Sequence, residues 1–199
     1  VKNVMLIKRN KIDFSSNYNE QEKTATRLII TQIFYALSLQ KKGGSFILKM
    51  FDLFSKISID IIYILSIYYE KVYIVKPYTS RYANSEKYIV CKGFKGINED
   101  YLQKLYIIVN SWDYFEKNNM NLIKIFDNIN NDYFDKVKLY NTKYFNIQIS
   151  SIESTLEYIK NKCDKEKKKQ VKKQVTAAFS WCKQYRCKIN YNSSYLIKK

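Results

Sequence analysis

Lys49 and Glu86 are the two residues whose types and settings best fit acid–base chemistry in this sequence. Lys49 lies near the end of the apolar run from Phe46 to Phe51, where a lysine is costly unless it is paired or opens onto a cleft. Desolvation there favours the neutral amine, which can act as a base on a hydroxyl. If the Lys49 strand pairs antiparallel with the strand that Glu86 begins, the two side chains become neighbours. A buried ion pair that only fixes strand register is the alternative.

A polar loop leads into Glu86. It contains Ser80, Arg81, Asn84 and Ser85, whose hydrogen-bond donors could hold a phosphate or a ribose. The alternative is an ordinary turn closed by its own polar side chains.

The elements that must position these residues alternate along the first half of the chain. Apolar periodicity and turn residues predict an α/β sheet with parallel strands and one antiparallel strand at the end. The last two strands are close enough in sequence to form a hairpin. The expected strands are residues 4–7, 45–51, 71–75 and 88–91, and the expected helices are residues 20–39 and 55–68.

The pattern changes after residue 97. Helical spacing predicts helices at residues 98–115, 151–162 and 166–184, so we expect a first domain at 1–97 and a basic helical extension at 98–199. The lysine-rich stretch 165–173 has two explanations, a solvated helix face or a contact with the RNA backbone.

Charge and histidine content limit the function. The chain has 35 Lys and Arg, 18 Asp and Glu, a formal charge of +17 and no histidine. The charge favours RNA or DNA as a partner, although lysines that only solvate the surface would give the same composition. The lack of histidine excludes histidine-based acid–base catalysis and histidine-ligated metal sites, and we expect no metal.

The cysteine and hydropathy patterns indicate in which cellular compartment the protein is expected. The four cysteines show no CxxC pair, which is typical of reduced thiols in a cytoplasmic or intravirion protein. The longest apolar run, residues 57–69, is too short and too polar to span a bilayer, and the N-terminus has no signal-peptide pattern. We therefore expect no membrane partner.

Three collinear motifs carry a family resemblance. They are Gly-Gly-x-Phe-x-x-Lys-x-Phe-Asp at 43–52, Glu-x-Val-Tyr-x-x-Lys-Pro at 70–77, and Thr-Ser-Arg-x-Ala-Asn-Ser-Glu-x-Tyr-x-Val-Cys-Lys at 79–92. Over roughly residues 4–96 the chain resembles FtsJ-like RNA 2′-O-ribose methyltransferases, in particular the cap-specific mRNA enzymes of eukaryotes and large DNA viruses. The resemblance implies the C-terminal half of a Rossmann-like methyltransferase sheet.

The resemblance also implies a chemistry. In that family a Lys-Asp-Lys-Glu tetrad activates the ribose 2′-hydroxyl for attack on the methyl group of S-adenosylmethionine. Lys49 matches the second lysine and Glu86 matches the glutamate. The matching motifs imply capped mRNA as the partner. For the location we expect the cytoplasm, or a viral factory or virion if the protein is viral. The motifs also imply RNA contacts by Lys76, Ser80, Arg81, Asn84 and Ser85.

Two departures from the family pattern leave several functions open. Arg9 stands where the tetrad aspartate is expected, and the glycine-rich cofactor loop and first lysine are expected upstream of Val1. One hypothesis is therefore a part or subunit of a cap 2′-O-methyltransferase, completed by further sequence or a second protein chain. The alternatives are a catalytically inactive, basic RNA-binding or structural subunit, and a nucleic-acid coating protein held by charge alone.

Overall fold

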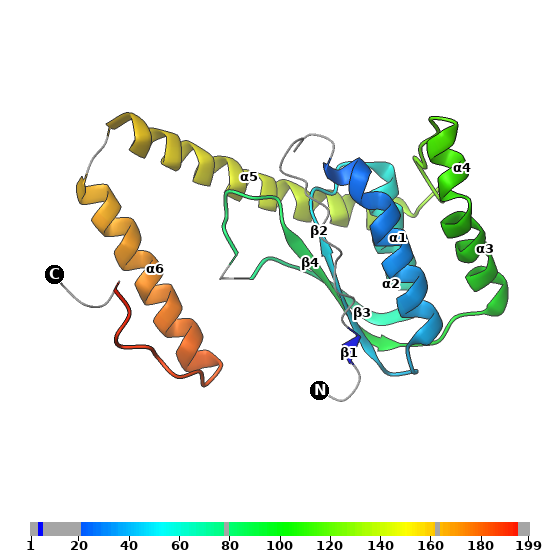
Figure 1. Ribbon diagram of the computed structural model, residues 1–199, viewed down its shortest axis with the longest axis horizontal. Coiled ribbons are helices and arrows are strands. Elements are labelled where there is room, and N and C mark those ends of the chain that lie inside the picture. Colours follow the sequence, from blue (N-terminus) through cyan, green and yellow to red (C-terminus); the bar gives the residue numbers. More distant parts are fainter. Residues whose placement is uncertain (1–3, 6–20, 78–79, 162–163, 195–199) are drawn as a thin grey trace. The chain divides into compact units, whose positions relative to one another are not determined.

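The computed structural model describes residues 4–5, 21–77, 80–161 and 164–194 (Figure 1). The chain folds into two compact units. Unit 1 comprises Val1–Lys76 with Ser85–Tyr144, and unit 2 comprises Pro77–Asn84 with Phe145–Lys199. The division into domains at 1–97 and 98–199 stays a prediction.

Unit 1 is built on one sheet with the strand order β1-β2-β4-β3. Strand β4 runs antiparallel to both of its neighbours, β2 and β3, while the short β1 pairs with β2 in parallel. The α/β class and the β3–β4 hairpin are confirmed. The expected position of the antiparallel strand at the end was wrong, because β4 uses one edge for the hairpin and the other for β2. The strands are β1 (Val4–Met5), β2 (Ser45–Met50), β3 (Tyr69–Val75) and β4 (Lys87–Phe94).

Side chains of β2 and β4 alternate between two faces of this sheet. Phe46, Leu48 and Met50 of β2 are buried, as are Ile89 and Cys91 of β4. The residues between them are only partly buried. One face of the sheet is therefore the core, and the other face can present polar groups.

Helices α1 (Gln21–Leu39) and α2 (Lys56–Tyr68) contact each other and the sheet. Ser55 caps α2 by accepting a hydrogen bond from the amide of Ser58. Gly43, with a φ of +79°, makes the turn from α1 into β2, and its amide donates to the Phe94 carbonyl over 2.7 Å. Both helices were predicted, with boundaries correct to within one residue.

The helices after residue 97 differ more from expectation. The segment predicted as one helix over 98–115 is two, α3 (Glu99–Asn110) and α4 (Trp112–Lys117). The long α5 (Asn131–Asn161) was predicted only from residue 151, and α6 (Asp164–Gln184) was predicted. The first part of α5 lies in unit 1, where Val137 joins the core. Its buried face also carries Asn141, and this polar residue interrupts the apolar periodicity.

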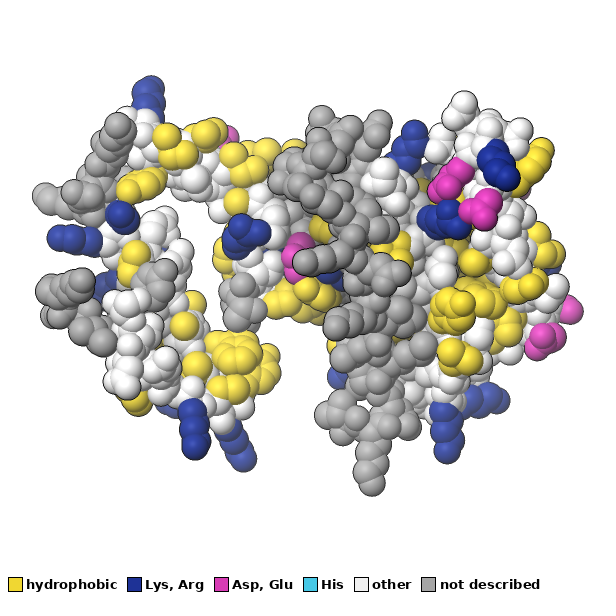
Figure 2. All heavy atoms as spheres, viewed as in Figure 1, with side chains coloured by type: hydrophobic (Ala, Val, Ile, Leu, Met, Phe, Trp, Pro, Cys, Tyr) yellow, Lys and Arg dark blue, Asp and Glu magenta, His cyan; other side chains and the backbone are white. Residues whose placement is uncertain are grey.

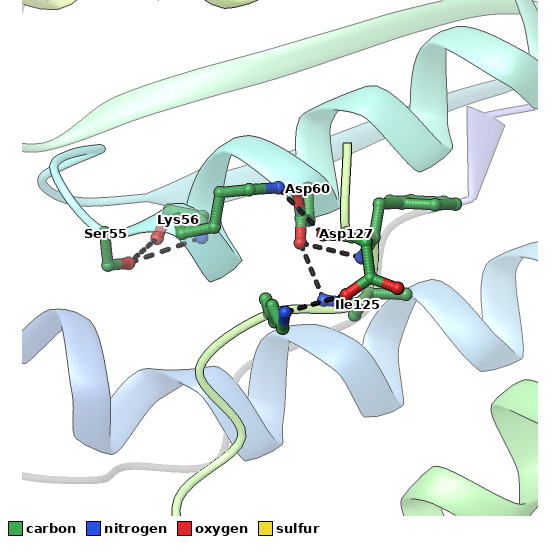
Figure 3. A network of polar contacts seen from close by, with 8 residues as sticks. Ser55, Lys56, Asp60, Ile125 and Asp127 are labelled. Atoms are coloured by element: carbon green, nitrogen blue, oxygen red, sulfur yellow. Dashed lines mark hydrogen bonds and ion pairs between the residues drawn. The ribbon is translucent and has the colours of Figure 1, made fainter. Parts of the chain in front are cut away.

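Asp60 of α2 fastens an irregular segment to the core of unit 1 (Figure 3). Its side chain is fully buried and accepts hydrogen bonds from the backbone amides of Ile125 and Phe126, at 2.6 and 3.1 Å. The ammonium group of Lys56, one helical turn away, pairs with the same carboxylate and also donates to the Phe126 carbonyl. This carboxylate therefore satisfies two amides of a segment that has no regular structure.

Asp60→Ala is expected to lower the free energy of unfolding by about 3 kcal/mol, because two amides and one ammonium group lose a buried acceptor. Urea unfolding monitored by circular dichroism measures this change. The matched control is Asp127→Ala, which removes an exposed carboxylate that pairs with Lys124 in the same segment. The control should leave the unfolding midpoint nearly unchanged. Equal midpoints for the two variants would contradict the role assigned to Asp60.

Candidate functional site

Lys49 and Glu86 form an ion pair at the edge of the sheet where β2 ends and β4 begins. The Lys49 ammonium lies 3.1 Å from a Glu86 carboxylate oxygen. The register explains this, since Lys49 pairs with Tyr88 across the antiparallel ladder and Glu86 precedes β4 by one residue. The predicted proximity of Lys49 and Glu86 is confirmed. The Lys49 side chain is 37% exposed and that of Glu86 is 21% exposed, so the pair is accessible from solvent and Lys49 is less desolvated than the sequence suggested.

Glu86 has a second side-chain partner besides Lys49. The Tyr88 hydroxyl, on the same strand face, donates to the other carboxylate oxygen over 2.5 Å. Burial alone would raise the pKa of Glu86, but the Tyr88 hydrogen bond, Lys49 and the charge of Lys76 together lower it below the ordinary value. Glu86 is therefore a carboxylate at neutral pH and can orient an adjacent ammonium or hydroxyl.

Lys87 is the buried lysine of this region, and sequence reasoning assigned it no role. Its side chain is 3% exposed and donates to the carbonyls of Phe51 and Ser85, over 3.3 and 3.1 Å. These carbonyls belong to the residue after β2 and the residue before Glu86. Lys87 therefore ties together the two chain segments that carry Lys49 and Glu86. The available signal was strand alternation, which places residue 87 on the core face with Ile89 and Cys91.

Asp52 is the charged partner of Lys87. Its carboxylate lies 3.9 Å from the Lys87 ammonium and has a side-chain hydrogen bond with Ser85. Burial raises the pKa of Asp52 and lowers the pKa of Lys87, while the opposite charge of each residue partly offsets the shift of the other. Sequence reasoning missed Asp52 as well, although it follows directly on the strand that carries Lys49.

The residues predicted to contact RNA fall into two groups. Lys76 and Ser85 belong to unit 1 with the ion pair, and the Lys76 ammonium donates to the Glu86 carbonyl over 2.9 Å. Ser80, Arg81 and Asn84 belong to unit 2. There the Asn84 amide donates to the Arg81 carbonyl, as in an ordinary turn. An RNA-binding role for these five residues stays a prediction.

The described residues do not form the cofactor loop of the resembled family. Gly43 and Gly44 join α1 to β2, Gly93 lies in β4, and Gly96 is a single glycine between β4 and α3, so no glycine-rich loop connects a described strand to the helix that follows it. Arg9 lies outside the described residues. The described part of the chain also contains no cluster of three potential metal ligands and no helix long and apolar enough to cross a membrane.

Comparison with known proteins identifies a family over this part of the chain. The FtsJ-like methyltransferase family matches residues 10–94. Cap-specific mRNA (nucleoside-2′-O-)-methyltransferase 1 of Bos taurus is 48% identical over 95 residues, and the protein of that name from Homo sapiens is 46% identical over 95 residues. Each alignment covers 46% of this chain and 11% of the relative.

A longer alignment joins this chain to the Danio rerio protein of the same name, with 33% identity over 147 residues. It covers 72% of the chain and therefore extends past residue 97, into a region for which the sequence suggested no relative. The chain spans only 18% of that relative's length. Residues 10–94 of this chain therefore match the FtsJ-like methyltransferase family, and the relatives that align with the chain are cap-specific mRNA members by name.

Proposed function

We propose that unit 1 is the acceptor-binding half of an S-adenosylmethionine-dependent mRNA cap 2′-O-ribose methyltransferase. The observation that carries the proposal is the Lys49–Glu86 ion pair, 3.1 Å long and accessible at the edge of the sheet. The relatives that match this segment are cap-specific mRNA 2′-O-methyltransferases by name. Because the chain spans a small part of their length, the activity belongs to a larger protein or assembly that includes this chain.

The proposed chemistry is activation of a ribose 2′-hydroxyl. In its neutral form the Lys49 amine takes the proton of the hydroxyl as the hydroxyl oxygen attacks the methyl group, and the Glu86 carboxylate holds the resulting ammonium in place. Tyr88 and Lys76 in turn fix the Glu86 side chain and backbone. A rigid pair of this kind orients the hydroxyl oxygen, and orientation is a large part of what an enzyme contributes to a transfer between two bound substrates.

S-Adenosylmethionine would supply an electrophilic methyl group to that oxygen. The described residues do not make a binding site for it, so we assign the cofactor to the rest of the methyltransferase fold, in further sequence or in a second protein chain. The extended parallel sheet of a Rossmann-like domain belongs to the same proposal, because the parallel pairing described here is limited to β1 and β2. A cytoplasmic site of action, or a viral factory or virion for a viral protein, is also part of this proposal.

An inactive, RNA-binding methyltransferase-like subunit is the competing proposal. Arg9, at the position expected for the catalytic aspartate, favours it. The ion pair favours an active enzyme, because Lys49, Glu86 and Tyr88 keep a mutually supporting arrangement on the accessible face of the sheet.

Lys49→Ala is expected to lower methyl transfer by about a hundredfold or more, since loss of a positioned general base has effects of this size. The assay follows labelled methyl groups from S-adenosylmethionine to capped RNA, for this chain alone and with any protein that co-purifies with it. The matched control is Lys95→Ala, which removes an exposed lysine just after β4. No transfer by the wild-type chain in any combination would favour the inactive subunit. Equal activity of wild type and Lys49→Ala would remove Lys49 from the mechanism.

Lys87→Met is expected to lower kcat for methyl transfer about tenfold, roughly 1.4 kcal/mol in the barrier. It should also lower the unfolding midpoint, because Asp52 and the carbonyls of Phe51 and Ser85 lose a buried partner. Methionine fills a similar volume, so the change removes the ammonium group and its hydrogen bonds without opening a large cavity. Lys92→Met, at an exposed position of the same strand, serves as the control. An unchanged kcat for Lys87→Met would show that Lys87 does not position the pair.

A further inference from the structure

The segment from Lys167 to Lys199 contains no acidic residue, although ten of its 33 residues are Lys or Arg. Most of it forms α6 and the turns that follow α6 in unit 2. No ion pair between described residues involves a lysine or arginine of this segment; the described salt bridges all lie in unit 1. A protein surface that only needs to be soluble usually mixes charges of both signs, so the one-sided charge here needs another explanation.

One face of α6 is polar, with lysines at both ends and hydroxyl side chains between them. Exposed polar residues recur every three or four positions and therefore share one side of the helix; they are Lys169, Lys172, Thr176, Ser180 and Lys183. Lys168 and Lys173 flank this row. From Lys169 to Lys183 the row extends over about 21 Å at 1.5 Å per residue. Figure 2 shows dark blue basic side chains over α6, next to hydrophobic ones at its C-terminal end.

The apolar side of α6 is engaged by the chain's own C-terminal segment. Val175, Ala178 and Cys182 line a hollow of about 340 Å³ together with Ile189 and Ser193. The rings of Phe179 and Tyr191 lie 6.4 Å apart. This internal packing turns the lysine face outward, where a partner can reach it.

An aromatic pair lies at the C-terminal end of α6. The rings of Trp181 and Tyr185 are 5.0 Å apart, and Tyr185 is 56% exposed. Lys183 lies between the two aromatic residues in the sequence and Arg186 follows Tyr185; both basic side chains are exposed. Exposed aromatic rings beside basic side chains are the combination that binds single-stranded nucleic acid, because bases stack on the rings while cations contact the phosphates.

We infer that α6 is a binding surface for the phosphodiester backbone of single-stranded RNA, separate from the Lys49–Glu86 site. The choice of RNA over DNA rests on the proposed function, whereas the binding surface itself does not. An anionic membrane surface is the competing partner for a basic helix, and the vesicle measurement below separates the two. The surface would hold the RNA independently of its sequence.

The test compares two variants of the full chain that lose the same charge. The first carries Lys168→Gln, Lys169→Gln, Lys172→Gln and Lys173→Gln; glutamine matches lysine in helix propensity. The control carries the same change at four exposed lysines of unit 1, Lys41, Lys95, Lys104 and Lys117. Binding of a short, fluorescent, uncapped single-stranded RNA is measured by anisotropy at several salt concentrations, and circular dichroism checks that both variants keep their helices.

The α6 variant should raise the Kd at least about tenfold and lower the slope of log K against log salt by about 3, since each phosphate contact contributes about 0.7. The control should change the Kd by less than about twofold at moderate salt, where distant charges are screened. Equal weakening of both variants, or none in the α6 variant, would overturn the inference. So would tighter binding of a DNA strand of the same sequence, or loss of binding to phosphatidylserine vesicles with RNA binding intact. The assay needs neither a cap nor a methyl donor, so its failure would leave the methyltransferase proposal standing.

Discussion

The antiparallel pairing of β4 with β2 is the constraint on which the rest of unit 1 depends. It sets Lys49 opposite Tyr88 and Met50 opposite Lys87, and so decides which side chains enter the core and which reach the accessible face. The same ladder brings the end of β2 next to the start of β4, where residues distant in sequence meet. Both the Lys49–Glu86 ion pair and the contacts of Lys87 on the core face follow from this single register.

The two lysines at this edge of the sheet do different work because they lie on opposite faces. Lys49 is half-exposed and pairs with a carboxylate that stays ionised. Lys87 is buried, and its ammonium donates to two backbone carbonyls and pairs with the Asp52 carboxylate. The accessible face carries the group that can react with a ligand, and the core face carries the group that keeps the two strand ends together. An active site often needs both, a reactive pair and a rigid support.

Much of this arrangement could be predicted from the sequence. The hairpin, the helices before residue 70 and the meeting of Lys49 with Glu86 follow from apolar periodicity and strand direction. Lys87 was missed because the expected strand began at residue 88, so the alternation was not followed back to the buried position 87. The first two thirds of α5 were missed because Asn141 occupies a core position. The interior place of β4 follows only when its two expected pairings, with β3 and with β2, are combined, because periodicity gives the elements and not their order in the sheet.

The register also predicts where this chain can change length. The described residues between Lys76 and Ser85 belong to no helix or strand, and an insertion there would leave the strands in place. A single insertion or deletion between Glu86 and Ile89 would exchange the faces of β4, putting a carboxylate into the core and a second ammonium beside Lys49. Related sequences should therefore vary in loop length before Ser85 and keep an invariant spacing from Glu86 through β4. This spacing would distinguish chains that have kept the pair from chains that have lost it, even where the individual residues differ.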